Sequence, residues 1–279
     1  RAGKHIYVDK PLCTSVQEAR DVVDAVQASG VRSQMFSLVR SSIGRRCAEA
    51  VRGGRLGRLV GLHAELLFAK GIAGTANLDQ PRREQAAGDR FTWVDSKREL
   101  FCVGLYPLVL FEWLTSRRVE SVEAATANYF FAEHQGNGAE DFAALLVGLE
   151  GGLEATITVG RSGWSSHPSH GIHQVHLVGT DGTASVDAFR PRLEIFSDAA
   201  GWSQPGTPHP EDPMGFWSST QESGGVLPKT DWWPLAEGAI ADAEYFLDCL
   251  DGDRESDVPV SMGAHAVEAI LAAYESAAR

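Results

Sequence analysis

The stretch that decides the fold is "GKHIYVDKPLCTS", residues 3–15. Its apolar run, HIYV, is typical of a buried strand and ends abruptly in Asp9, Lys10 and Pro11. Open α/β sheets bind their ligands beyond the carboxyl ends of the strands. An acid and a base followed by a proline, which restricts the backbone, therefore predict a functional turn at this strand end.

The residues that follow predict one βαβ unit. Thr14 or Ser15 is suited to cap a helix, and Glu18 stands three residues after Ser15, as in a capping box. Apolar residues recur at helical spacing as far as Gly30, which is the expected end of the helix. The run "VRSQMFSLVR" then indicates a second strand. A strand, a helix and a strand with short joints imply a parallel sheet.

The rest of the chain predicts a second, larger unit. A helix "IGRRCAEAVRGGRLG" and a strand "RLVGLHAELLFA" precede an apolar helical segment at residues 100–114, which a glycine and a proline interrupt. Six strand-like runs between residues 119 and 198 are joined by Gly-Gly and Asp-Gly turns, which favours a meander or another antiparallel sheet. Helices are expected at about 234–251 and 261–278. The predicted fold is a short α/β piece followed by a large, mostly antiparallel sheet flanked by helices.

The composition of the chain excludes some classes of binding partner and favours others. The chain has 279 residues, is 43% hydrophobic and carries a net charge of -12, which argues against a nucleic-acid partner and fits a small-molecule ligand. Its four cysteines form no CxxC pair, so we expect free thiols in a reducing, cytoplasmic compartment. The longest uncharged apolar run, residues 100–111, is shorter than the roughly 20 residues of a membrane span, so no membrane partner is expected.

With this order of elements, "GKHIYVDKPL" resembles the Gfo/Idh/MocA oxidoreductases. In that family a strand of the dinucleotide-binding domain ends in Glu-Lys-Pro, where this chain has Asp9-Lys10-Pro11. The similarity continues through Gly57, the segment Gly104-x-Tyr106-Pro107 and "HLVGTDGTASVD", and it covers essentially the whole chain. The resemblance implies an NAD- or NADP-dependent oxidoreductase with a Rossmann domain.

The first element of the family is missing from the sequence. No strand is followed by G-x-G-x-x-G, the turn that places the pyrophosphate at a helix N-terminus, and the chain begins with Arg1 instead of Met. We therefore expect a truncated version of a longer dehydrogenase. Residues 1–40 would be the C-terminal part of the Rossmann domain, and residues 41–279 an α+β domain for substrate binding and oligomerisation.

Lys10 is the first candidate site residue. An ammonium at the strand end can donate a hydrogen bond to a substrate hydroxyl and stabilise negative charge that develops on oxygen. The resemblance implies that Lys10 contacts the substrate and the nicotinamide ribose, with Asp9 and Pro11 in the same cofactor-binding turn. Arg40, expected at the end of the second strand, is a further candidate for contact with the cofactor. A surface lysine and a solvated arginine are the alternatives.

Tyr106 is the second candidate. A subgroup of the family that includes glucose–fructose oxidoreductase and dihydrodiol dehydrogenases reads D-x-G-x-Y-P, and this chain is similar to it. Cys102 replaces the usual Asp, and Val109 stands at the second acidic position. The resemblance implies that Tyr106 moves the hydroxyl proton of the substrate. Because the pKa of a free tyrosine is near 10, we expect Lys10 to lower the pKa of Tyr106. The alternative is a core tyrosine on an apolar helix.

A polar, aromatic stretch, "GRSGWSSHPSHGIHQVH", supplies the remaining candidates. Arg161, Trp164 and His173 are predicted to face a carbohydrate-like substrate. Four histidines between residues 167 and 176 also suggest a metal site. The intervening proline and glycine argue against a helix, however, and on a strand His173 and His176 would point to opposite faces, so no metal site is predicted.

Three functions remain open. The first is an oxidoreductase that transfers hydride between a nicotinamide and a sugar, polyol or related cyclic alcohol, assembled as a homo-oligomer through the open face of its sheet. The second is a non-catalytic ligand-binding or assembly protein on the same fold. The third, a zinc hydrolase that uses the histidines, would require bound metal.

Overall fold

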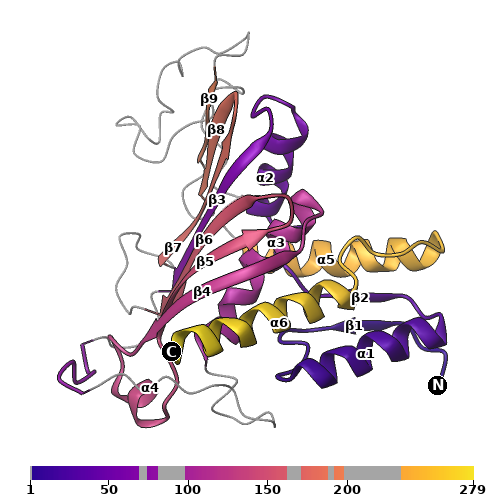
Figure 1. The fold of residues 1–279 in the computed structure, drawn as a ribbon. Coiled ribbons are helices and arrows are strands. Elements are labelled where there is room, and N and C mark those ends of the chain that lie inside the picture. The colour runs from indigo at the N-terminus through magenta and orange to yellow at the C-terminus, as the bar shows by residue number, and fades with distance from the viewer. Residues whose placement is uncertain (1, 69–73, 81–97, 162–170, 188–191, 198–233) are drawn as a thin grey trace.

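The computed structural model describes residues 2–68, 74–80, 98–161, 171–187, 192–197 and 234–279. The candidate substrate residue Trp164 lies outside these ranges. The described residues form a small N-terminal pair of strands with its helix and a larger curved sheet (Figure 1). Helix α6 lies between these two parts of the molecule.

The N-terminal unit has the predicted βαβ connectivity. Strand β1 (Ile6–Val8) pairs in parallel with β2 (Ser33–Met35), and α1 (Val16–Ser29) connects them. Ser15 caps α1, because its side chain accepts a hydrogen bond from the backbone N–H of Glu18 at 3.2 Å. Strand β2 is shorter than the quoted run and stops at Met35, whose backbone N–H donates to Val258 in another part of the chain.

All six predicted strand runs form strands, and they join a seventh in one sheet. Within the described residues the order is β4-β5-β6-β3-β7-β8-β9. Strand β3 (Leu59–Phe68) lies between the two meanders, parallel to β6 and antiparallel to β7, so the sheet is mixed and mostly antiparallel, as predicted. The other strands are β4 (Val119–Ala127), β5 (Phe142–Leu149), β6 (Leu153–Arg161), β7 (Gly171–Gly179), β8 (Gly182–Asp187) and β9 (Arg192–Ser197).

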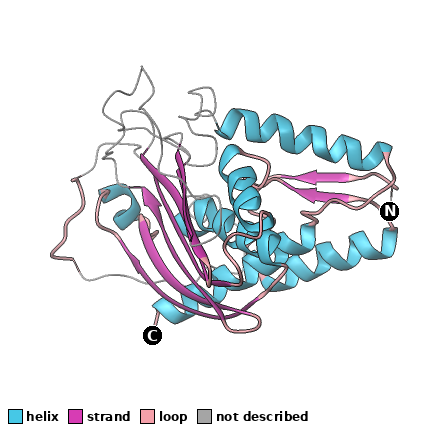
Figure 2. Cartoon of the chain, turned by 90° about the horizontal axis from the view of Figure 1, so that it is seen from above, coloured by secondary structure: helices cyan, strands magenta, loops and turns pink. Residues whose placement is uncertain are grey.

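Helices cover one face of this sheet (Figure 2). Helices α2 (Ser42–Arg52), α3 (Leu105–Thr115) and α6 (Val260–Ala277) pack over a core that includes Leu145, Val147 and Ile157. Alternate residues such as Leu146 and His63 point to the opposite face, where they are exposed. The remaining helices are α4 (Ala132–Gly136), between β4 and β5, and α5 (Pro234–Asp251). Across the described part of the chain, no helix combines the length and apolar character that a membrane crossing requires.

The apolar segment predicted at 100–114 is one continuous helical element with an irregular start. A π-helical turn, η2 (Leu100–Gly104), runs directly into α3, so the glycine and proline do not interrupt it. Pro107 lies in the first turn of α3, where a missing N–H is tolerated. π-Helical turns are rare and occur often at functional sites.

Close packing of α6 against β2 joins the N-terminal unit to the larger one. A Cβ atom at Gly263 would lie 2.1 Å from Sδ of Met35, which is fully buried. Any larger side chain at this position on α6 would therefore force either the Met35 side chain or the helix to move.

We expect Gly263→Ala to lower the free energy of unfolding by about 1–3 kcal/mol, the usual cost of overpacking a core. Chemical denaturation of the two proteins measures the difference. Met35→Ala supplies the control, since it makes room for the added methyl group. The double variant should lose less stability than the sum of the single variants, and strict additivity would contradict the proposed contact.

A buried carboxyl group connects α5 to both N-terminal strands. Asp242 on α5 is 0% exposed, and its Oδ2 accepts hydrogen bonds from the Tyr7 hydroxyl at 3.0 Å and from Nε2 of Gln34 at 3.1 Å. Burial raises the pKa of Asp242 to about 6, against the lowering effect of these hydrogen bonds.

This pKa predicts a pH dependence of stability. Because the folded state holds the Asp242 proton more tightly than the unfolded state, the stabilising contribution is full below about pH 3.8 and is lost as the pH rises through about 6. The free energy of unfolding, relative to an Asp242→Asn variant, should fall by roughly 3 kcal/mol between about pH 4 and pH 7. Asp248→Asn, an exposed change on the same helix, is the control. A difference that stays flat with pH would refute the assignment.

Candidate functional site

The structure brings Lys10 next to the helix that carries Tyr106. Lys10 lies two residues beyond the end of β1, and its Nζ is 3.4 Å from Sγ of Cys102 and 5.5 Å from the centroid of the Tyr106 ring. The Asp9 carboxylate accepts a hydrogen bond from the backbone N–H of Lys10 at 2.7 Å, and the Lys10–Pro11 peptide bond is cis. We expected Lys10 to lie close enough to Tyr106 to affect its pKa. Their proximity across more than ninety residues is a result of the fold.

The environment of Tyr106 differs from the expected one. Its side chain is 7% exposed and packs edge-on against Phe36, with the ring centroids 6.2 Å apart. Burial raises the pKa of Tyr106, and Cys102 and Asp9 raise it further, so the expectation that Lys10 lowers this pKa is wrong. At neutral pH Tyr106 therefore keeps its proton and can donate a hydrogen bond, but it does not act as a phenolate base.

A buried ionic cluster holds the start of η2. Arg98 and Glu140, 4% exposed each, form an ion pair of 3.5 Å. Glu140 also accepts hydrogen bonds from the backbone N–H of Leu100 at 3.1 Å and from the hydroxyl of Tyr274 on α6. Burial raises the pKa of Glu140, while these partners and Arg98 oppose the shift. The cluster ties the first residues of η2 to β5 and α6.

Glu99 forms a second buried contact at the same helix start. It is 0% exposed, and its Oε1 lies 3.3 Å from Nε of Arg161 and 3.5 Å from Nε2 of His134. Arg161 ends β6, and its side chain is 32% exposed. The predicted substrate residue Arg161 is thus held by a carboxylate only three positions before Cys102, in the helical element that leads to Tyr106.

Arg40, which was predicted to contact a cofactor, contacts other side chains of the protein. It lies in a turn beyond β2 and does not end that strand, which corrects the expected position. Its guanidinium forms an ion pair with Asp257, and it stacks 3.6 Å from the ring centroid of Tyr245 and 5.7 Å from that of Trp113. These contacts link α3 and α5 to the loop before α6, and they give Arg40 a structural role. Contact with a cofactor stays a prediction.

The histidine-rich stretch is only partly described. His173 lies on β7 opposite Leu66 and is 5% exposed, and burial lowers its pKa to about 4, so it is neutral at physiological pH. His176 points to the other, open face, as the strand alternation predicts. Trp164 and the other two histidines lie outside the described residues. Within the residues that the structure describes, no group of three or more potential ligands could hold a metal ion.

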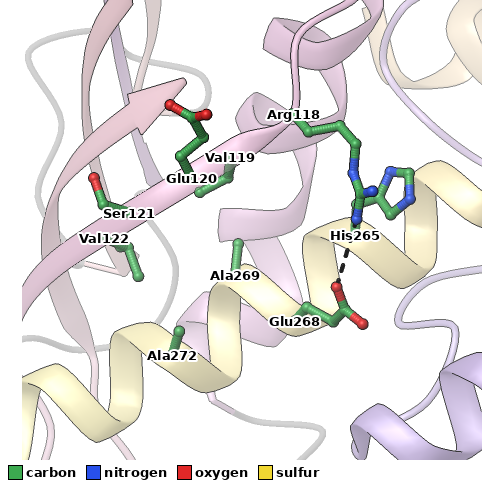
Figure 3. A pocket seen from close by; sticks show the side chains of 9 residues that line it. All are labelled: Arg118, Val119, Glu120, Ser121, Val122, His265, Glu268, Ala269 and Ala272. Carbon is green, nitrogen blue, oxygen red and sulfur yellow. Dashed lines mark ion pairs between the residues drawn. The ribbon is translucent and has the colours of Figure 1, made fainter. Parts of the chain in front are cut away.

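A surface pocket lies elsewhere, between β4 and α6 (Figure 3). Arg118 and Glu268 face each other across it at 3.8 Å, and Glu268 also pairs with Arg20 at 3.5 Å. His265 is held by Glu112 at 2.8 Å. These pairs balance the charge of the pocket and link β4, α1 and α3 to α6. The complete lining is Arg118, Val119, Glu120, Ser121, Val122, His265, Glu268, Ala269 and Ala272.

Comparison with known proteins agrees with this architecture. Residues 45–185, which include most of α2, all of α3 and most of the sheet, match the model of the GFO/IDH/MocA C-terminal domain. The chain belongs to the GFO/IDH/MocA family. No curated protein matches its sequence. The matched region lies within the larger unit and ends before its C-terminal helices, and the βαβ unit precedes the match.

Several solved structures share the fold. The WlbA dehydrogenase from Bordetella pertussis, in complex with NADH and UDP-GlcNAcA, is 20% identical, with a TM-score of 0.66 over 99% of this chain and 71% of that one. A levoglucosan dehydrogenase in complex with NADH and L-sorbose is 17% identical, with a TM-score of 0.69 over 99% and 72%. The scyllo-inositol dehydrogenase from Lactobacillus casei, with NAD(H) and scyllo-inositol, is 16% identical, with a TM-score of 0.65 over 99% and 71%.

The ionic cluster at the start of η2 escaped the sequence analysis. Its members come from separate parts of the chain, and a charged residue in sequence gives no sign that it will be fully buried. Glu99 stands directly before the apolar run, which was the only available signal. The cluster is made up of Arg98, Glu99, His134, Glu140, Arg161 and Tyr274.

We expect Glu140→Ala to lower the free energy of unfolding by about 3–5 kcal/mol, because it removes a buried charge that faces the Arg98 guanidinium and leaves the Leu100 N–H and the Tyr274 hydroxyl without this acceptor. The denaturant midpoint measures this loss. Glu154→Ala, an exposed glutamate on β6, is the matched control and should change stability by less than about 0.5 kcal/mol. Equal effects of the two substitutions would contradict a stabilising role for the cluster.

Proposed function

We propose that this protein is an NAD(P)-dependent oxidoreductase that acts on a sugar, a polyol or a related cyclic alcohol. The observation that carries the proposal is the position of Lys10. Its ammonium group extends from the carboxyl end of β1 to the helical element that bears Cys102 and Tyr106. This strand end is the usual ligand position in α/β sheets, and here it meets the larger unit.

In this proposal Lys10 and Tyr106 act as hydrogen-bond donors to the reacting oxygen of the substrate. The lysine is cationic, and Tyr106 keeps its proton because burial raises its pKa. Two donors aimed at one oxygen stabilise the negative charge that develops there as a hydride leaves or joins the neighbouring carbon. The proton that enters or leaves the substrate oxygen passes through Lys10 or Tyr106.

The residues present fit one end of a nicotinamide cofactor. When bound, the nicotinamide would supply or accept the hydride. Asp9, Lys10 and Pro11 form a turn at a strand end that suits contact with a ribose or nicotinamide. A glycine-rich turn after a strand does not occur in the sequence, so no residue of this chain is assigned to the cofactor phosphates.

The substrate class is inferred from two supports. The similar proteins were solved with polyhydroxylated ligands, among them L-sorbose and scyllo-inositol. In this chain, Arg161 presents a partly exposed guanidinium at the end of β6, positioned by Glu99, and could donate hydrogen bonds to hydroxyl groups. We assign Arg161 to the substrate together with Trp164. His173 is buried and neutral, so in this proposal it supports the site from within the sheet.

Two structural proposals accompany this function. The βαβ unit is assigned to residues 1–40 and the larger unit to residues 41–279, because β2 ends before residue 40 and α2 begins after it. Self-association through the open face of the seven-stranded sheet is proposed because exposed Leu146 and the polar residues around it lie there.

A non-catalytic ligand-binding protein is the second candidate, and Cys102 favours it. Cys102 stands where the resembling subgroup has an aspartate, and the raised pKa of Tyr106 removes a general base. In this case the protein would bind a polyol without turning it over.

The decisive experiment uses protein expressed from the whole reading frame that contains these residues. NAD- and NADP-linked turnover would be screened with scyllo-inositol, L-sorbose and glucose, and cofactor binding measured by calorimetry. We expect Tyr106→Phe and Lys10→Met each to lower kcat by about 100-fold or more, the usual contribution of a positioned proton donor.

The controls are Tyr129→Phe and Lys4→Met, which change exposed residues of the same types and should leave kcat unchanged. Full activity in the Lys10 and Tyr106 variants would overturn the assigned roles. Polyol binding without binding of either nicotinamide cofactor would favour the non-catalytic candidate.

A further inference from the structure

The contact between Lys10 and Cys102 joins an amine to a sulfur. Nζ and Sγ are 3.4 Å apart, and both side chains are partly exposed. One residue follows strand β1 and the other belongs to the π-helical turn η2, so the fold itself creates the pair. At this distance a small displacement is enough to bring the nitrogen within bonding range of the sulfur.

The other three cysteines lack this combination. Cys47 and Cys249 are fully buried, and the Cys13 thiol donates to the backbone oxygen of Ser15 at 3.4 Å. Burial also raises the pKa of Cys13, which disfavours its reactive thiolate form. Among the four cysteines, only Cys102 is both partly exposed and in contact with an amine.

We propose that Cys102 and Lys10 form an oxidative modification site, in which a peroxide drives a covalent sulfur–nitrogen bond between the two side chains. The inference goes beyond the proposed function and does not depend on it, because it needs only these two residues and an oxidant. If the proposed function holds, the same bond also switches the enzyme off.

The chemistry proceeds in two steps. The Cys102 thiolate attacks a peroxide oxygen, the O–O bond breaks, and sulfur is oxidised by two electrons to a sulfenic acid while the peroxide is reduced. The hydroxide released from the peroxide takes a proton from the Lys10 ammonium and leaves as water, which frees the amine. The unprotonated amine of Lys10 then attacks the sulfur, an S–N bond forms and the S–O bond breaks. The departing hydroxide takes a proton from the nitrogen and leaves as water. The net reaction converts the thiolate, the ammonium and one hydrogen peroxide into a sulfenamide and two waters.

The surroundings favour each step. The Cys102 sulfur is partly exposed, so a peroxide can reach it. The amine then competes with water for the sulfenic acid at an advantage, because it is held at the sulfur instead of arriving by diffusion. The product has lost the Lys10 ammonium, the group proposed to orient the substrate. Thiol reductants attack the sulfenamide sulfur and restore both side chains, so the change is reversible.

Peptide mapping tests the proposal on this chain alone. Trypsin releases Lys10 in the peptide of residues 5–20, because Pro11 blocks cleavage after the lysine, and Cys102 in the peptide of residues 99–117. Cys13 lies in the first of these peptides, and a Cys13–Cys102 disulfide would have the same mass as the sulfenamide. The experiment therefore uses Cys13→Ser as the starting protein. The protein is treated with hydrogen peroxide, its remaining thiols are alkylated, and the digest is analysed by mass spectrometry.

We expect the Cys13→Ser protein to yield a linked pair of these two peptides, with a mass two hydrogen atoms below their sum, which dithiothreitol separates. The same protein with Lys10→Gln should lose the linked pair and show Cys102 as a sulfenic acid that dimedone traps. A linked pair that persists without Lys10 would overturn the proposal. So would Cys102 that stays a dimedone-reactive sulfenic acid, or stays unoxidised, while Lys10 is present.

Discussion

The close approach of α6 to β2 is the contact on which the arrangement of the whole molecule depends. Gly263 allows it, because the absence of a side chain leaves room for the buried sulfur of Met35. The same helix packs on α1 and on β4, and therefore contacts both the small parallel unit and the large sheet. Once α6 is in place, the carboxyl end of β1 lies beside η2, and Lys10 comes within reach of Cys102 and Tyr106.

Buried charged residues hold the helical element that contributes Cys102 and Tyr106 to the site. Arg98, Glu99 and Glu140 are withdrawn from water at the start of η2, where each is held by opposite charge or hydrogen bonds. Such groups contribute little net stability compared with apolar residues, but they tolerate few alternative arrangements. The cluster orients the helical element that bears Cys102 and Tyr106 in relation to β5 and β6. The irregular π-helical start of this element lies directly between the cluster and Tyr106.

The environment of Tyr106 shows why a motif does not define its own chemistry. The sequence placed a lysine and a tyrosine in one site, and a cation near a phenol lowers its pKa. In the folded chain the ammonium lies nearer to the Cys102 sulfur and over the face of the tyrosine ring, while burial of the phenol raises its pKa. Lys10 and Tyr106 are therefore both hydrogen-bond donors. Lys10 and Cys102 also form a sulfur–amine pair, which the spacing of these residues along the chain does not reveal.

The sequence by itself determined the elements that depend on local patterns. The cap at Ser15, the stop at Gly30, six strands and two C-terminal helices follow from spacing and turn chemistry, and they are present. Tertiary structure alone decided the rest. Strand β3 enters the sheet between two meanders, Arg40 pairs with Asp257, and Glu99 is buried against Arg161. Each of these outcomes joins residues far apart in sequence, and long-range packing and desolvation, which no local pattern records, select them.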